Sequence, residues 1–240
     1  MGLVSHGAPR DLILALRNQF ALKVFVETGT FRGETAEWAS LEFEKVYSVE
    51  ANLQIYDSTR AKLGGIPNLT LAHGESPTFL HALLGELVAP MVVWLDAHWC
   101  ASAETFGQEN ECPLLAELDA LSESKCENFV LIDDARLFLA PPPAPHDYTK
   151  WPSLEEVMQS TFVARRRPHF VVVDDVILMA PLHARSWIAD YLRAAETRRG
   201  EQMLSSGANM AAAGIKRIYW GARRKARDLF RRALSRPLRR

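Results

Sequence analysis

Short apolar runs alternate with amphipathic segments over roughly the first 140 residues. The apolar runs have the length of strands, and the segments between them carry leucines at helical spacing. We expect strands at 23–28, 45–50, 68–72, 91–95 and 129–132, and helices at 11–20, 53–63, 113–123 and from about Pro77 onwards. Strands that alternate with helices in this way predict βαβ units and a parallel sheet with helices on both faces.

The pattern changes after the fifth expected strand. Five prolines interrupt residues 140–152, and Ser153 and Glu156 then have the spacing of a capping box, which predicts a new helix. Two further apolar runs, 169–173 and 176–180, are joined by two aspartates and predict an antiparallel hairpin. The sequence therefore predicts an α/β, doubly wound (Rossmann-like) fold. Its seven-stranded, mostly parallel sheet ends in that antiparallel hairpin, and a C-terminal basic amphipathic helix follows.

A chain of 240 residues with 48% hydrophobic content is long enough to bury one sizeable core. We expect one domain over residues 1–195 and a helical tail over 196–240. No apolar run approaches 18 residues, and the first residues lack the order of a signal peptide, so neither a membrane span nor export is expected. Three cysteines, Cys100, Cys112 and Cys126, are too few for a disulfide framework, which favours a cytoplasmic location.

The most informative segment runs from Val24 to Thr35, where a strand turns into a helix around two glycines. Gly29 would let the backbone approach a nucleotide-like ligand, and Gly33 would let the helix begin in close packing. Acidic residues close three of the following strands, namely Glu50, Asp96, and the pair Asp133 and Asp134. Because parallel strands end at one edge of a sheet, we expect these carboxylates to line one ligand site.

Residues 23–136 resemble the class I S-adenosylmethionine-dependent methyltransferases, and most of all the metal-dependent O-methyltransferases of the catechol type and their bacterial tailoring relatives. The resemblance implies that the first turn holds the methionine part of S-adenosyl-L-methionine, and the matching residues are Glu27, Gly29, Thr30, Gly33 and Thr35. It also implies that Glu50 binds the ribose hydroxyls. Glu75 and Ser76, after the third strand, match the motif that lines the adenine pocket.

In that family the aspartate after the fourth strand binds a magnesium ion, and the fifth strand supplies further oxygen ligands. The resemblance therefore implies a Mg²⁺ (or similar divalent cation) site made by Asp96, Asp133 and Asp134, with Asp96 also beside the cofactor. A hard cation held by carboxylates lowers the pKa of a hydroxyl group and orients it for methyl transfer. The residues alone leave other roles open, because Asp96 could bind only the cofactor or cap a helix, and Asp133-Asp134 could begin a turn.

The group that deprotonates the acceptor is left open. The family has a lysine after the tryptophan of this motif, and here that position is Cys100. We assign His98 and Asp96 as the catalytic residues, with His146, Tyr148 or the metal alone as alternatives for the base.

Two long segments, 99–112 and 138–152, follow the fourth and fifth strands on the ligand side of the sheet. Long loops in compact domains are usually lids or binding loops, so we expect these to shape the acceptor pocket. The aromatic candidates to line it are Trp99, Phe106, Phe138, Tyr148 and Trp151. Arg136 is a candidate to hold an anionic or hydroxylated acceptor, with an exposed surface arginine as the alternative.

These observations predict an S-adenosylmethionine-dependent methyltransferase, with metal-assisted O-methylation of a small hydroxylated acceptor such as a sugar or secondary metabolite. One alternative is a metal-independent methyltransferase of the same fold. Another is a non-catalytic cofactor-binding or scaffold protein recruited through its tail. The scaffold is disfavoured because it would need none of the carboxylates.

The net charge of −1 conceals an uneven distribution. Residues 211–240 carry 11 Lys or Arg and one acid, a charge of +10, whereas the other 210 residues carry 17 basic and 28 acidic side chains, a charge of −11. Apolar residues of the tail, among them Ile218, Leu229 and Phe230, recur at helical spacing. Such a helix is typical of an anionic membrane surface or a protein-docking element, and the acidic body makes nucleic acid the least favoured partner. The expected location is cytoplasmic, peripheral to the inner membrane face.

Deleting residues 211–240 should abolish co-sedimentation of the protein with anionic vesicles, because each basic residue near such a surface contributes about 1 kcal/mol. Binding of the full chain should weaken with salt, since the Debye length shrinks to roughly 3 Å at 1 M. Neutral vesicles are the control. Equal pelleting of the full-length and truncated proteins would rule out the membrane role and favour a protein partner.

Overall fold

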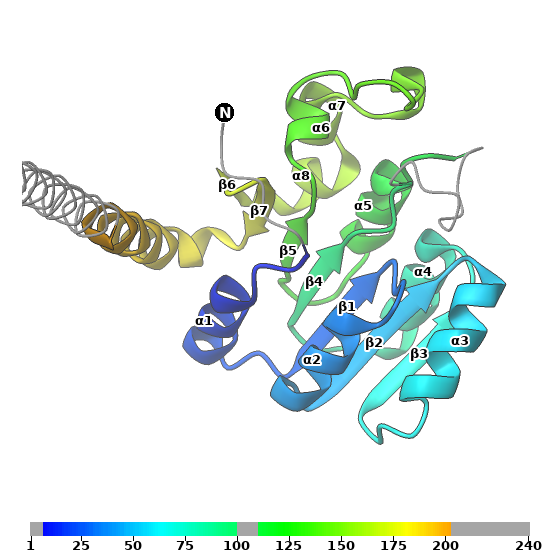
Figure 1. Ribbon diagram of the computed structural model, residues 1–240. Helices are drawn as coiled ribbons and strands as arrows, with labels where there is room; N and C mark the ends of the chain where they lie inside the picture. The colour runs from blue at the N-terminus through cyan, green and yellow to red at the C-terminus, as the bar shows by residue number, and fades with distance from the viewer. Residues whose placement is uncertain (1–6, 100–109, 203–240) are drawn as a thin grey trace, which may run out of the picture. The chain divides into compact units, whose positions relative to one another are not determined.

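The computed structural model describes residues 7–99 and 110–202 of the chain. Seven strands of this part form one sheet in the order β3-β2-β1-β4-β5-β7-β6 (Figure 1). The first five pair in parallel, and β7 is antiparallel to both β5 and β6. The strands are β1 (Val24–Thr28), β2 (Lys45–Glu50), β3 (Leu69–His73), β4 (Met91–Leu95), β5 (Phe129–Ile132), β6 (His169–Val173) and β7 (Val176–Ala180). This is a doubly wound, Rossmann-like fold, so the predicted mostly parallel seven-stranded sheet with its antiparallel hairpin is confirmed, whereas the predicted basic C-terminal helix lies outside the described residues.

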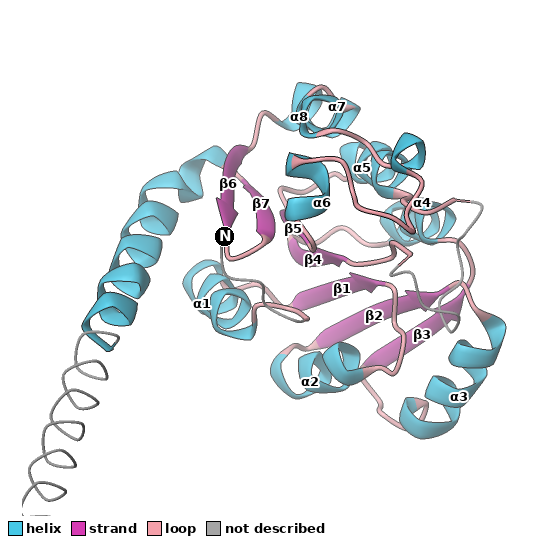
Figure 2. Ribbon diagram, turned by 45° about the horizontal axis from the view of Figure 1, so that its top comes forward, coloured by secondary structure: helices cyan, strands magenta, loops and turns pink. Residues whose placement is uncertain are grey.

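Helices cover both faces of the sheet (Figure 2). The helices before β3 lie on one face, and they are α1 (Arg10–Phe20), α2 (Glu34–Glu42) and α3 (Leu53–Leu63). The two helices between β3 and β5, α4 (Ser76–Glu86) and α5 (Leu114–Ser122), lie on the other face. Short helices fill the connection from β5 to β6, and they are α6 (Arg136–Leu139), α7 (Leu154–Met158) and α8 (Thr161–Arg166). Two-sided cover explains why the parallel strands read as uninterrupted apolar runs.

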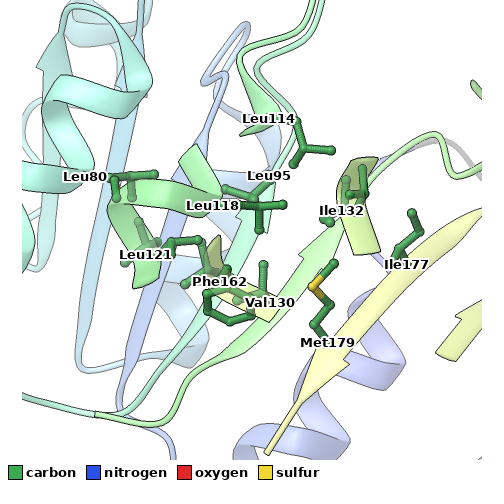
Figure 3. Close-up of a cluster of buried hydrophobic side chains, with 14 of the residues drawn as sticks. Leu80, Leu95, Leu114, Leu118, Leu121, Val130, Ile132, Phe162, Ile177 and Met179 are labelled. Atoms are coloured by element: carbon green, nitrogen blue, oxygen red, sulfur yellow. The ribbon is translucent and has the colours of Figure 1, made fainter. Parts of the chain in front are cut away.

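The main core lies between the sheet and α5, and Figure 3 shows its side chains. All five residues of β4 are buried, as are all four of β5 and all five of β7. Leucines at helical spacing on α5, namely Leu114, Leu118 and Leu121, meet these strands, and Phe162 of α8 closes the cluster. The leucine spacing that predicted the helix is therefore also what builds the core.

The hairpin and its turn agree with the prediction. Asp174 and Asp175 join β6 to β7, and their φ angles of +47° and +71° place both in the left-handed region. This is the condition for a type I′ turn, which short-chain aspartate tolerates better than most residues. The capping box of Ser153 and Glu156 is also present at the start of α7. The helices α6 and α8 were not predicted.

The chain divides into two compact units, one ending at Arg185 and the other covering 186–240. Residues 186–202 of the second unit are helical, so the boundary predicted after residue 195 falls inside this helix. The division into a catalytic domain and a tail stays a prediction. The basic part of the tail, 211–240, lies outside the described residues, as do Cys100 and Phe106. No helix of the described part is long and apolar enough to cross a membrane.

Candidate active site

The candidate site lies where the strand order reverses, between the carboxyl ends of β1 and β4. Thr28 pairs with Leu95 at this edge, and the chain leaves β1 through Gly29, whose φ is +85°. A Cβ on Gly29 would lie 2.3 Å from the Asp96 carbonyl oxygen. This glycine was predicted to let a ligand approach the backbone, but its first role is to allow contact between the two strand ends. Open α/β sheets bind ligands at such a switch point.

Glu50 closes β2 beside the switch point and is only 8% exposed. Its Oε2 accepts a hydrogen bond from the Phe31 amide (2.8 Å), and its Oε1 accepts one from the Asn52 amide (2.8 Å). A carboxylate offers about four acceptor positions, so both oxygens keep capacity for a ligand hydroxyl. The two amides fix the orientation of the group that was predicted to bind the ribose.

Glu27 is buried under the first turn, with 2% of its surface exposed. Ser48 donates a hydrogen bond to its Oε2 (2.7 Å) and also shares one with the Thr30 hydroxyl (2.6 Å). Burial raises the pKa of Glu27 to about 8, although the hydrogen bonds from Ser48 and Thr35 oppose the shift. Glu27, Thr30 and Thr35 therefore form one polar cluster beneath the turn, as their assignment to one motif suggests.

Gly33 begins α2 in the left-handed region, with φ +75°. A Cβ there would lie 2.5 Å from Leu63 and 2.8 Å from Thr59, so the predicted close packing is confirmed and the partner is α3. Thr59 also donates a hydrogen bond to the Phe31 carbonyl oxygen (2.6 Å). A cavity of about 490 Å³ opens here, lined by the loop at Phe31 and one side of α3. None of the strand-end carboxylates lines it, so this cavity is separate from the candidate chemistry.

The turn after β3 places Ser76 at the first residue of α4 and Glu75 at its N-cap. Ser76 is 6% exposed, whereas Glu75 is exposed and makes no side-chain cap. The carboxyl ends of β2 and β3 are aligned, because Glu50 pairs with His73. Both predicted adenine-site residues are thus at the same edge as Glu50.

His98 joins the ends of β4 and β5. Its Nε2 lies 2.9 Å from Asp134 Oδ2, and its Nδ1 lies 3.7 Å from Asp96 Oδ1. The imidazole is 8% exposed. Burial disfavours its charged form, but the hydrogen bond to Asp134 and the charge of Asp96 outweigh burial and raise the pKa of His98. His98 and Asp96, the predicted catalytic residues, are therefore brought together.

The two aspartates after β5 have different environments. Asp133 is 6% exposed, and burial together with the charges of Asp96 and Asp134 raises its pKa to about 8. Burial raises the pKa of Asp96 as well, to about 6. For Asp134 burial is outweighed by hydrogen bonds from His98 and Arg136, which lower its pKa.

Arg136 links this cluster to the β6–β7 turn. Its guanidinium lies 2.5 Å from Asp134 Oδ1 and also pairs with Asp175. Asp175 in turn accepts a hydrogen bond from the Arg136 amide (2.9 Å). The residue considered as an acceptor contact is thus tied to two aspartates, and 44% of its side chain remains exposed.

The predicted divalent-cation site has the right donor chemistry, since carboxylate oxygens are the ligands that Mg²⁺ prefers. Its arrangement fits less well. No group of three or more potential ligands within 7–99 and 110–202 is placed to hold a metal ion. Both oxygens of Asp134 already have side-chain partners, His98 and Arg136. The assignment of Asp96, Asp133 and Asp134 to a metal therefore stays a prediction.

Sequence reasoning missed Glu111, which is 2% exposed and joins the two loops of the acceptor side. Its carboxylate accepts hydrogen bonds from Trp151 Nε1 (2.8 Å) and from the Asp147 amide (3.1 Å). His146 Nδ1 lies 3.4 Å from the same group, and its ring packs edge-on against Trp151 at 5.2 Å. Tyr148, by contrast, is 63% exposed. Of the three candidate bases, only His98 contacts the strand-end aspartates.

Three predicted pocket aromatics, Trp99, Phe138 and Trp151, are buried rather than open to a ligand. Phe138 packs against Trp151 with ring centroids 5.6 Å apart, and Trp151 packs against His98 at 5.4 Å. Trp151 therefore packs directly against the imidazole, and Phe138 packs against Trp151. Glu117 of α5 is a second buried acid that was not predicted from the sequence. Its burial could have been predicted, because it lies on the leucine face of that helix.

No protein-family model matches the chain, and no curated protein matches it. Solved structures do resemble it. The O-methyltransferase TomG from Streptomyces achromogenes, involved in tomaymycin synthesis and solved with SAM, is 16% identical with a TM-score of 0.49, and the match covers 74% of this chain and 82% of that one. An O-methyltransferase from Bacillus cereus in complex with SAH is 15% identical with a TM-score of 0.47, covering 74% and 84%. A putative O-methyltransferase from Klebsiella pneumoniae is 18% identical with a TM-score of 0.47, covering 75% and 84%.

Replacing Glu27 with Gln should flatten the pH dependence of stability. The folded protein keeps the Glu27 proton up to about pH 8, whereas the unfolded chain releases it near its ordinary pKa of 4.5. The stability contributed by this group is therefore complete below the lower value and is lost as the pH rises towards the upper one, with a slope of up to about 1.4 kcal/mol per pH unit. Denaturant unfolding between about pH 5 and pH 8 measures the slope. The exposed acid Glu44, changed to Gln, is the control, and a slope in E27Q equal to that of the wild type would contradict the assignment.

Proposed function

We propose that the protein is an S-adenosylmethionine-dependent methyltransferase that methylates a hydroxyl group of a small acceptor. The observation that carries this proposal is the arrangement at the switch point. Gly29 and Asp96 lie in backbone contact there, and the fixed carboxylate of Glu50 is one strand away. A dinucleotide or nucleoside ligand in an open α/β sheet occupies this position.

The residues present fit the cofactor. Glu50 retains acceptor capacity on both oxygens for two ribose hydroxyls. Side-chain exposure of 30% makes Asp96 accessible from the ligand edge. The bound cofactor would supply a methyl group activated by its sulfonium, and the chain would bind it, orient it and exclude water.

His98 is the group that we assign to receive the acceptor's proton. A base needs a partner that fixes its orientation and tautomer, and Asp134 at 2.9 Å supplies one. Trp151 holds the other side of the ring. The raised pKa of His98 means that the neutral, proton-accepting imidazole predominates only above its ordinary titration range.

Metal assistance is the second form of the proposal. It is supported by the repulsion between Asp96 and Asp133, two neighbouring carboxyl groups with raised pKa values that a divalent cation would relieve. A sugar or secondary-metabolite acceptor is proposed from the resemblance alone. The cytoplasmic location is proposed from the sparse cysteines, and a membrane or protein partner for 211–240 is proposed from the basic amphipathic pattern of that segment. The non-catalytic scaffold remains the alternative outside enzymes.

Glu50→Ala should weaken binding of S-adenosylhomocysteine by roughly 1–3 kcal/mol, the range for losing hydrogen bonds to a charged group. Calorimetric titration measures the affinity, and thermal unfolding shows whether the variant is folded. Glu44→Ala, which changes an exposed acid just before the opposite end of β2, is the matched control. Absence of binding by the wild type would overturn the proposed function, and unchanged affinity in the variant would overturn the role of Glu50.

His98→Gln should lower methyl transfer by roughly 10²–10⁴-fold, the range for removing a general base, while leaving S-adenosylhomocysteine affinity unchanged. Transfer is measured with methyl-labelled cofactor against a panel of catechols, phenols and sugars. The exposed His81 of α4, changed to Gln, is the control. Wild-type activity in H98Q would refute the base assignment.

Wild-type activity that disappears in excess EDTA and returns with Mg²⁺ would support the metal form, and full activity in EDTA would eliminate it.

A further inference from the structure

Glu111 is a buried acid to which the proposed reaction gives no role. It lies shortly before α5, and its surface is 2% exposed. Its carboxylate accepts hydrogen bonds from Trp151 Nε1 (2.8 Å) and from the Asp147 amide (3.1 Å to Oε1 and 3.2 Å to Oε2). Burial raises the pKa of Glu111, but these bonds and the nearby His146 outweigh burial and lower the pKa. Both oxygens are therefore acceptors at neutral pH, and both bind the segment that contains Trp151.

The main chain of Glu111 is also fixed beside the imidazole of His98. The Trp99 amide donates a hydrogen bond to the Glu111 carbonyl oxygen (2.8 Å), and Trp99 directly follows His98 in the chain. The Glu111 side chain holds Trp151, whose ring centroid lies 5.4 Å from that of His98. Glu111 thus reaches the imidazole by two routes, one along the main chain and one through the indole of Trp151.

Hydrogen bonding decides how the Trp151 indole lies. The residue is 6% exposed, and its ring packs against those of His98, Phe138 and His146 at centroid distances of 5.4, 5.6 and 5.2 Å. Contacts between aromatic rings allow more than one ring orientation. Nε1 is the single donor of the indole, and a buried indole N–H usually has a partner. The bond to Glu111 therefore selects one orientation of the ring that packs against His98.

An imidazole that acts as a base must be held in one orientation. Asp134 binds one ring nitrogen of His98 (2.9 Å), but a hydrogen bond at one nitrogen does not by itself fix the tilt of the ring plane. Trp151 packs at an interplanar angle of 60° to the imidazole and restrains that tilt. The restraint matters because a misplacement of about 1 Å can cost roughly 10²-fold in rate.

We propose that Glu111 is a positioning residue for His98. Its carboxylate holds the Trp151 indole in the orientation that restrains the imidazole, and its carbonyl oxygen holds the main chain just beyond the base. This inference rests on the proposed function, in which His98 receives the proton of the acceptor. It adds to the site a residue that no strand end supplies.

The direct test is NMR spectroscopy of the full chain with isotope-labelled histidine. Glu111→Gln keeps the size of the side chain but has one acceptor oxygen, and its amide group would face a donor. It should shift the ring signals of His98, which His98→Gln assigns, because the neighbouring indole changes orientation. The signals of the exposed His81 should not shift. Trp151→Phe keeps an aromatic ring but removes the donor, and it provides the same test if Glu111→Gln does not fold.

Glu156→Ala is the matched control for these variants. The carboxylate of Glu156 accepts a hydrogen bond from the Ser153 amide (2.7 Å), two residues after Trp151, so it holds the same connection between β5 and β6 at a point beyond the indole. Loosening the connection there should lower the melting temperature without shifting the His98 signals.

The kinetic test is a double-mutant cycle with His98→Gln, with methyl-labelled S-adenosylmethionine and catechol as the probe acceptor. Glu111→Gln should lower kcat by roughly 10- to 100-fold, because the base is misplaced. The KM for S-adenosylmethionine should stay within about threefold of the wild type, since Glu50 is untouched. In the His98→Gln background the Glu111 change should lower kcat no further, because the group that it positions is already absent.

Two results would overturn the inference, namely unchanged His98 signals in folded Glu111→Gln and Trp151→Phe variants, and rate losses that multiply in the double variant. An equal shift of the His98 signals in Glu156→Ala would also overturn it, because any loosening of the connection would then move the imidazole. Absence of S-adenosylhomocysteine binding by the wild type would instead overturn the proposed function. The NMR comparison would still decide whether Glu111 orients His98, so the two failures are distinguishable.

Discussion

The parallel register of β1 with β4 is the constraint on which the candidate site depends. Because Thr28 pairs with Leu95, the segments that follow β1 and β4 leave the sheet side by side. The Asp96 amide donates a hydrogen bond to the Thr28 carbonyl oxygen (3.1 Å). The same register brings the Asp96 carbonyl to the space that a Gly29 side chain would need. Asp133 joins the edge by the next pairing, since its amide bonds to the Leu95 carbonyl oxygen at 3.1 Å. A larger residue at position 29 would separate these strand ends and every side chain they carry.

The buried acids of this edge divide into two kinds according to what surrounds them. Asp134 receives hydrogen bonds from His98 and Arg136, which lower its pKa and keep it ionised. Glu27, Asp133 and Glu117 have hydroxyl or amide donors, or other acids, as neighbours, and burial raises the pKa of each. Near neutral pH Glu27 and Asp133, whose pKa values are raised to about 8, hold a proton and can donate as well as accept. The edge is therefore less negative than its count of carboxyl groups indicates, and it offers donors to a ligand that carries its own charge.

Most of the fold could be predicted from sequence because each buried parallel strand is an apolar run with a polar end. The predicted bounds of β2, β4 and β5 are those observed, and polar residues such as Glu50 were placed by the rule that parallel strands end together. The role of Glu111 could not be predicted, since its partner Trp151 lies 40 residues away in the sequence. Hydrophobic periodicity identifies the face of a helix, but it does not say which hydroxyl or indole a buried acid will meet there. The short helices α6 and α8 were missed because four and six residues are too few for a periodic pattern.

The two forms of the proposed mechanism compete for one carboxylate. Asp134 orients His98 through Oδ2 and binds Arg136 through Oδ1, so a cation that took either oxygen would release an existing partner. Loss of the Oδ2 contact would leave the imidazole held by its packing against Trp151 and its weaker approach to Asp96. A metal centre that includes Asp134 and a fully oriented His98 base are therefore alternatives rather than additions. Arg136 occupies Oδ1, and its link to Asp175 ties the position of Asp134 to the β6–β7 turn.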